Sequence, residues 1–139
     1  MKDKLLSKQG WVILLICIIS FFINNRVVVP DIMEARNMVT AREMVHDGNW
    51  LVPTMNGDLR LEKPPLPTWL TAVAEMISPD NLALQRAMAG FAAILLVAFF
   101  YLTAVQVMRN KRYAFISTIL LCTCYNIILM GRTASWDIY

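Results

Sequence analysis

Glu62 and Lys63 are the two charged residues whose setting best suits a chemical role. Asn56-Gly57 precedes them, and a proline-rich run begins at Pro64. An Asn-Gly dipeptide favours a tight turn and prolines restrict the backbone, so both side chains would be held in fixed positions. A lysine held in this way is a point-charge partner for a phosphate group. The open alternative is an exposed Glu–Lys ion pair, which contributes little to stability.

Asp31, Glu34 and Asp137 are further acidic candidates. Asp31 and Glu34 have the spacing of a capping box, in which Asp31 accepts the backbone N–H of Glu34, and a chemical role is the alternative. Asp137 follows the last apolar run, where a carboxylate at membrane depth would be costly and therefore suspect, or would simply lie in water. Arg26 and Arg132 flank apolar runs and could either anchor the chain at the membrane interface or contact a lipid phosphate.

The composition places these residues in a chain that needs an apolar environment. Hydrophobic residues make up 58% of the 139 residues, charged residues 17%, and the mean hydropathy is +0.52. Soluble domains have about 45–50% apolar and about 25% charged residues, so a soluble enzyme and a disordered chain are both disfavoured. A net charge of +3 without a basic cluster argues against nucleic-acid binding. Cys17, Cys122 and Cys124 lie in apolar runs and are expected to pack as small hydrophobic residues.

Three apolar runs explain this composition: Trp11–Val29, Ala87–Met108 and Tyr113–Met130. At about 1.5 Å per residue, each is long enough to cross the hydrocarbon core of a bilayer. The first run follows a basic amino terminus and lacks a small-residue cleavage site, which indicates an uncleaved anchor. The sequence therefore predicts an all-α integral membrane protein with three transmembrane helices and one long outer loop, residues 30–86.

The basic residues predict the orientation of this protein in the membrane. Lys2, Lys4 and Lys8 precede the first run, and residues 109–112 between the second and third runs are also basic. The positive-inside rule places both stretches in the cytoplasm. Residues 30–86, with eight of the ten acidic residues, then face the periplasm or the outside. We therefore expect a multi-pass protein of the cell (inner) membrane with a cytoplasmic amino terminus.

The first part of the outer loop has the pattern of an amphipathic helix over residues 33–47, with Gly48 as its stop signal. Its polar positions include Glu34. The expected buried face consists of apolar residues at helical spacing: Ala35, Met38, Ala41 and Val45.

The second part of the outer loop begins with the tight turn at Asn56-Gly57. Residues 62–67 are expected to be non-helical because of their prolines. A short apolar helix over residues 68–77 would lie at the membrane interface or re-enter the membrane. Ser78 or Asp80 is expected to cap the second membrane helix.

Three stretches together resemble the amino-terminal part of the GT-C glycosyltransferases, in particular the aminoarabinose transferases of lipid A and the protein O-mannosyltransferases (glycosyltransferase families 83 and 39). The first is Pro30–Pro53, which contains Pro-Asp-x-x-Glu-Ala-Arg-Asn and Arg-Glu-Met-Val. The second is Asn56–Leu66, in which Glu-Lys-Pro-Pro-Leu follows the Asn-Gly turn, and the third is Asp137. The resemblance covers essentially the whole chain and implies a GT-C fold.

The resemblance implies transfer of a sugar from a polyisoprenyl-phosphate donor to a glycolipid or protein acceptor on the outer side of the bilayer. The leaving phosphate needs charge neutralisation, which a cationic side chain or a divalent ion such as Mg²⁺, Mn²⁺ or Zn²⁺ can supply. Members of this family are several times longer, so the chain is expected to be a fragment that is inactive alone. A non-catalytic membrane scaffold is the alternative, and it would need none of the loop carboxylates.

The resemblance also implies roles for individual residues. Glu34 and Arg36 fall on the Glu and Arg of the family's Asp-Glu-x-Arg pattern, but Met33 falls on its Asp. Asp31 takes the Asp position only with two inserted residues; both carboxylates stay candidates, and Asp31 is preferred because it directly follows the helix exit. The implied set is Asp31, Glu34 and Asp137 as catalytic residues, Lys63, Arg36 and Arg132 as substrate-binding residues, and Glu62 and Asp31 as metal ligands.

Overall fold

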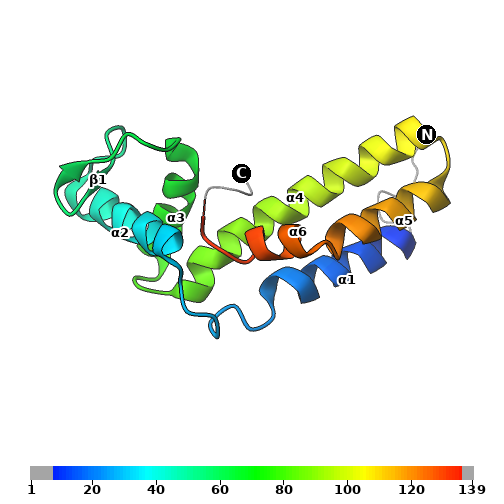
Figure 1. Cartoon of the computed structure of the whole chain (residues 1–139), viewed down its shortest axis with the longest axis horizontal. Helices are drawn as coiled ribbons and strands as arrows, with labels where there is room; N and C mark the ends of the chain where they lie inside the picture. Colours follow the sequence, from blue (N-terminus) through cyan, green and yellow to red (C-terminus); the bar gives the residue numbers. More distant parts are fainter. Residues whose placement is uncertain (1–7, 136–139) are drawn as a thin grey trace.

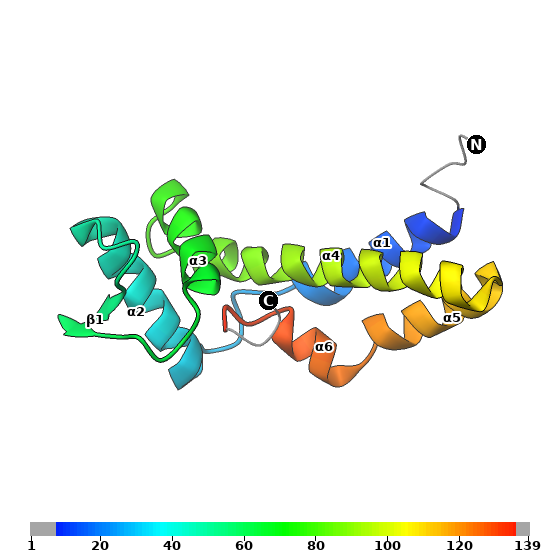
Figure 2. The ribbon, with the colours of Figure 1, turned by 90° about the horizontal axis from the view of Figure 1, so that it is seen from above.

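The computed structural model describes residues 8–135. It has two parts that lie end to end (Figure 1, Figure 2). The bundle consists of α1 (Lys8–Phe22), α4 (Leu82–Met108), α5 (Lys111–Cys122) and α6 (Tyr125–Met130). The lobe, residues 30–81, consists of α2 (Ile32–Asp47), strands β1 (Thr54–Met55) and β2 (Asp58–Leu59), and α3 (Pro65–Ile77). The expected helical fold class is confirmed, with one two-stranded hairpin in the lobe.

The bundle packs through small and apolar side chains at helical spacing. Ile13, Cys17 and Phe21 of α1 form a buried cluster with Ala89, Ala93 and Val97 of α4 and Cys122 of α5. Gly131, directly after α6, packs against this same cluster. A Cβ at this position would lie 2.8 Å from the Phe21 ring and 2.9 Å from the Ala93 methyl group. The cysteines at positions 17 and 122 pack in this core as expected, whereas Cys124 is exposed.

Among the described residues, one helix is long and apolar enough to cross a membrane, α4. It begins at Leu82, five residues before the expected run, because Asn81 caps it by accepting the Leu84 N–H at 3.3 Å. The expectation that Ser78 or Asp80 would be the cap is wrong. At about 1.5 Å per residue, the 27 residues of α4 extend for about 40 Å.

The first and third apolar runs form shorter helices than the sequence predicts. The helix expected over 11–29 ends at Phe22, because Asn24 takes a left-handed conformation with φ of 57° and the chain turns through residues 23–28. The helix expected over 113–130 is interrupted after Cys122. There the hydroxyl and the N–H of Thr123 both use the Ile119 carbonyl, and Cys124 becomes extended.

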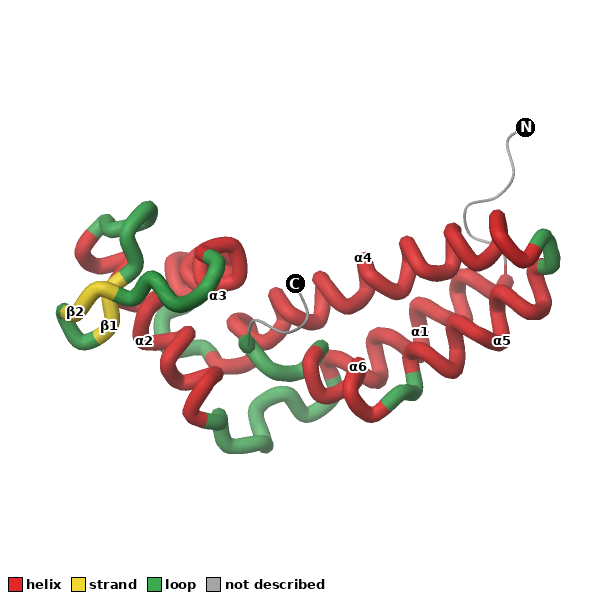
Figure 3. Tube along the Cα trace, turned by 45° about the horizontal axis from the view of Figure 1, so that its top comes forward, coloured by secondary structure: helices red, strands yellow, loops and turns green. Residues whose placement is uncertain are grey.

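The start of α1 and the turn between α4 and α5 lie at the same end of the bundle (Figure 3). The chain enters α1 near Lys8 and runs toward the lobe, and α4 returns to the turn at residues 109–110. The lobe lies at the opposite end of α4. This arrangement is the one that the charge pattern requires if both basic stretches are to face one side of a membrane.

The lobe confirms most of the local predictions. Asp31 caps α2, and Gly48 ends it with φ of 73° and an N–H bond to the Met44 carbonyl. Asn56 and Gly57 have φ of 56° and 83°, which are the values of a tight hairpin turn.

The prediction that residues 62–67 would be non-helical is wrong in part. Helix α3 begins at Pro65 and includes Pro67 in its first turn. Proline is tolerated there because the first N–H groups of a helix have no intrahelical acceptor. Glu62 and Lys63 therefore lie immediately before a helix start, and Pro64 is the residue at its amino-terminal cap.

Candidate functional site

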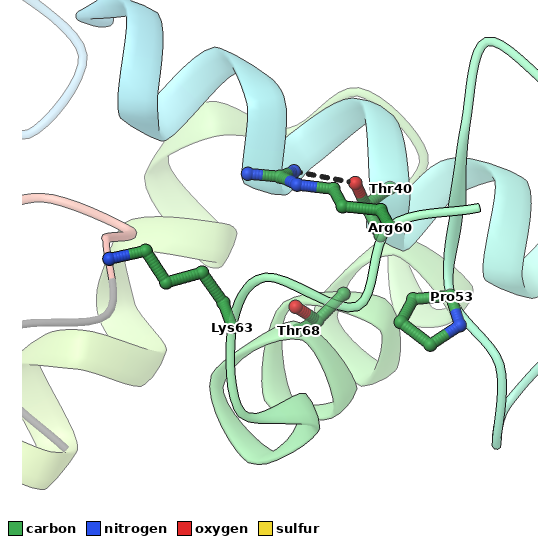
Figure 4. A pocket seen from close by; sticks show the side chains of 5 residues that line it. All are labelled: Thr40, Pro53, Arg60, Lys63 and Thr68. Atoms are coloured by element: carbon green, nitrogen blue, oxygen red, sulfur yellow. Dashed lines mark hydrogen bonds between the residues drawn. The ribbon is translucent and has the colours of Figure 1, made fainter. Parts of the chain in front are cut away.

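Lys63 lines a shallow pocket of about 180 Å³ on the lobe (Figure 4). The other lining residues are Thr40 from α2, Pro53 and Arg60 from either side of the hairpin, and Thr68 from α3. The pocket thus combines two cationic side chains with two hydroxyl groups. The two cationic side chains supply charge that suits an oxyanion, whereas both hydroxyl protons are already donated, from Thr40 to the Arg36 carbonyl and from Thr68 to Asn37.

Arg60 is the buried cation of this pocket, with 7% of its surface exposed. Its Nη1 donates to the Arg36 carbonyl and to the Thr40 hydroxyl, both at 2.7 Å. Burial lowers the pKa of this guanidinium, whereas the carboxylate of Glu62 raises it. Because the guanidinium nevertheless keeps its proton in water at any physiological pH, the floor of the pocket is positively charged.

A second polar centre joins the lobe to the start of α4. Arg86 donates from Nε and Nη2 to the two carboxylate oxygens of Glu34, each at 2.7 Å, in a fork-to-fork pair. Its Nη1 donates to the Asn25 and Val28 carbonyls, at 2.5 and 2.9 Å. Glu34 and Arg86 are both buried, with 0% and 1% of their surface exposed. We call this pair and its hydrogen bonds the clamp.

The clamp lies next to the segment that follows α6. Ala134 donates its N–H to Glu34 at 2.9 Å, and its carbonyl accepts from Asn37 at 2.7 Å. Asn37 also donates to Thr71 and accepts from Thr68, a residue of the Lys63 pocket. A continuous polar network therefore connects the clamp, residue 134 and the pocket.

The remaining candidates within the lobe are more exposed than these two centres. Asp31 is exposed and accepts the Glu34 N–H at 2.7 Å, which confirms the predicted capping contact. Arg36 is exposed and contributes its carbonyl to Arg60. Glu62 is exposed beside Lys63. The structure therefore brings Lys63, Glu62 and Arg36 to one region around Arg60.

Arg132 and Arg26 both contact the turn that links α1 to the lobe or lie within it. Arg132 donates to the Ile23 carbonyl just beyond α1. Arg26, in the same turn, lies 3.4 Å from the Asn81 side chain that caps α4. Asp137 lies outside the described residues, so its catalytic role stays a prediction.

The comparisons with known proteins identify relatives. No family model matches the chain. Over 92 residues, 66% of its length, the chain is 34% identical to an undecaprenyl phosphate-α-4-amino-4-deoxy-L-arabinose arabinosyl transferase of Pseudomonas savastanoi. Over 108 residues, 78% of its length, it is 31% identical to the Shewanella sediminis protein of the same name.

A solved structure agrees with these sequence matches. The crystal structure of ArnT from Cupriavidus metallidurans bound to undecaprenyl phosphate superimposes with a TM-score of 0.77 over 95% of this chain, at 21% identity. This chain is related to the aminoarabinose transferases, and its fold is that of part of a GT-C protein. It spans 17% and 19% of the two curated transferases and 25% of the ArnT chain. The resemblance drawn from the sequence is thus confirmed.

The relationship to the aminoarabinose transferases directs attention to a metal site, and the described residues do not form one. Among residues 8–135, no three His, Cys, Asp or Glu side chains lie close enough together to hold an ion. Asp31 is engaged as a helix cap, and Glu62 lies on an exposed segment. A metal therefore stays a prediction.

Arg86, Asn37 and Arg60 are the site residues that the sequence analysis missed. Arg86 directly precedes the run Ala87–Met108, and the structure places it within the first two turns of α4. A charged residue at the start of a membrane helix calls for a partner, and this signal was present in the sequence. Asn37 and Arg60 lie within the two stretches that carry the family resemblance, but polar residues at these positions are typical of a solvated surface and gave no reason to expect burial.

Proposed function

We propose that this chain contributes the donor-phosphate region of a membrane glycosyltransferase that takes a sugar from a polyisoprenyl phosphate. The observation that carries the proposal is the Lys63 pocket, found in a chain whose relatives are named as arabinosyl transferases. The related ArnT structure contains undecaprenyl phosphate. The acceptor is a glycolipid or a protein hydroxyl on the outer side of the membrane.

The proposed chemistry begins at the phosphate that leaves with the polyisoprenyl lipid. This group gains negative charge as the bond to the sugar breaks, so a fixed cation lowers the energy of the transition state. Lys63 supplies that charge beside the pocket, with its side chain extended away from Thr68 and Pro53 (Figure 4), and the guanidinium of Arg60 adds to the positive field.

The acceptor side needs a different group. An acceptor hydroxyl must lose its proton during the attack on the sugar, and a carboxylate is a suitable base. Asp31 is the exposed carboxylate at the start of α2 and fits this role, with Asp137 as the second acidic group. Arg36 and Arg132 are the proposed further contacts to the substrates.

The proposal includes a topology, with the lobe on the periplasmic or outer side. We expect a cysteine that replaces Asn56, at the exposed hairpin turn, to react with a membrane-impermeant maleimide added to intact cells. Arg112→Cys, at the basic end of the bundle, should react only after the membrane is opened. The exposed Cys124 is replaced by serine in both variants. Labelling of the hairpin only from the cytoplasmic side would contradict the orientation and with it the proposed compartment.

The function is tested by sugar transfer from a radiolabelled polyisoprenyl-phosphate donor in membranes that contain the protein as the cell makes it. We expect transfer to fall at least about tenfold when Asp31 or Glu62 is replaced by alanine. Replacement of His46, an exposed side chain bonded to its neighbour Asp47, should leave transfer unchanged. A scaffold would be indifferent to all three substitutions, and that result would favour the non-catalytic alternative.

A further inference from the structure

The clamp is unusual because a charged pair is buried with its hydrogen bonds satisfied. All three nitrogens of the Arg86 guanidinium donate, to Glu34 and to the Asn25 and Val28 carbonyls, and both oxygens of Glu34 accept from Arg86. A pair of this kind is not required for stability, since apolar residues can fill the same volume equally well. Its value lies in fixing the relative positions of the segments that it joins.

The segment that gains most from this fixation is the one after α6. Residues 34 and 134 are 100 positions apart, and yet Glu34 holds the Ala134 N–H. One helical turn further along α2, Asn37 holds the Ala134 carbonyl. Both backbone groups of one residue are therefore bound by side chains of α2, three residues before Asp137 in the sequence.

The same side chains set the position of the pocket. Asn37 accepts the Thr68 hydroxyl at 2.9 Å, and Thr68 lines the pocket together with Lys63. One turn of α2 thus contacts both the segment that leads to Asp137 and the first turn of α3, the helix that follows Lys63. A shift of residue 134 would change its distance from the pocket.

We propose that Glu34 and Arg86 are positioning residues: they hold the segment leading to Asp137 against α2, in register with the Lys63 pocket. This inference rests on the proposed function and deepens it. It also separates the two acidic candidates at the start of α2. Glu34 is fully buried, with its oxygens bound to Arg86 and Ala134, so it acts through other groups, whereas Asp31 is exposed to substrate.

The first test measures the position of the segment without any activity. Ser135 is 5% exposed, and its replacement by cysteine provides a small probe next to residue 134. In a Cys124→Ser background, this probe should react slowly with a maleimide in detergent. Glu34→Gln or Arg86→Lys should raise its rate by about tenfold or more, because the segment can then leave α2.

Two controls separate a local release from general unfolding. Cys17 and Cys122, buried in the bundle, should stay unreactive in the clamp variants. Glu75 is a matched residue: it is a buried carboxylate of the lobe, 5% exposed, and it is bound by Gln85, the residue just before Arg86. Glu75→Gln should leave the rate at Ser135→Cys unchanged. An unchanged rate in Glu34→Gln and Arg86→Lys, or equal exposure of Cys17, would overturn the proposal.

The second test measures sugar transfer by the same variants without the cysteine probe. Release of the segment around residue 134 should lower kcat by a factor on the order of 10–100. The donor KM should change little, because Lys63 still binds the phosphate. The double variant Glu34→Gln/Arg86→Lys should be no slower than the slower single variant. Wild-type kcat in variants whose segment is released would overturn the functional half of the proposal. Absence of transfer by the unsubstituted protein as the cell makes it, and not by this 139-residue chain alone, would refute the proposed function, and the labelling result would still decide the clamp.

Discussion

Lys63→Met should lower the turnover of sugar transfer by a factor of about 10–1,000. Methionine keeps an unbranched stem but removes the charge that faces the departing phosphate. Pro64 follows directly and α3 begins at Pro65, so the backbone behind the lysine is restricted and its ammonium is presented at low entropic cost. The measurement is transfer from a polyisoprenyl-phosphate donor in membranes with matched expression.

Lys63→Arg is the control for charge at this position. It should lose less activity than the methionine variant, and some loss is expected because a planar fork differs from a compact ammonium. The fold should be the same in both variants because the Lys63 side chain is exposed. Wild-type turnover in Lys63→Met would mean that the phosphate is bound elsewhere, and Arg132 and Arg26 would be the next residues to replace.

Elements with local causes could be predicted from the sequence. The helix expected over 33–47 is observed as Ile32–Asp47, because an aspartate cap and a glycine stop both act within one turn of the helix ends. The Asn56-Gly57 turn follows from two residues that tolerate positive φ. The Glu-Lys-Pro-Pro element also led to the correct family, and its Lys63 lines the pocket.

The buried face of α2 could not be predicted in this way. The apolar positions expected to be buried include Ala35, which is exposed, whereas Glu34, Asn37 and Thr40 are buried. A hydrophobic pattern assigns polar residues to the solvent unless their partners are known. Those partners are residues 60, 68, 71, 86 and 134, and contacts over such separations are set by the tertiary fold.

Arg86→Met should be strongly destabilising, with a loss of about 3–5 kcal/mol in the free energy of unfolding. The substitution removes four hydrogen bonds. It leaves the Glu34 carboxylate buried and without its counter-ion, and it leaves the Asn25 and Val28 carbonyls without their donor. Desolvation of the carboxylate accounts for most of the loss, since a buried charge without a partner is far costlier than a buried neutral group.

The size of this effect depends on burial, so an exposed arginine is the proper control. Arg42 is 58% exposed and pairs with the exposed Asp80 and, at 3.8 Å, with the buried Glu75. Glu75 keeps Gln85 and the Asp80 N–H as donors without Arg42, so Arg42→Met should cost no more than about 1 kcal/mol. Glu34→Leu combined with Arg86→Met should recover part of the stability, because no charge is then left unpaired, although the Ala134 N–H still lacks its acceptor. Unfolding in mixed micelles with increasing denaturing detergent, followed by tryptophan fluorescence, gives the three values. Equal losses for Arg42→Met and Arg86→Met would show that the pair at the start of α4 is exposed to water, and the clamp could then not fix residue 134.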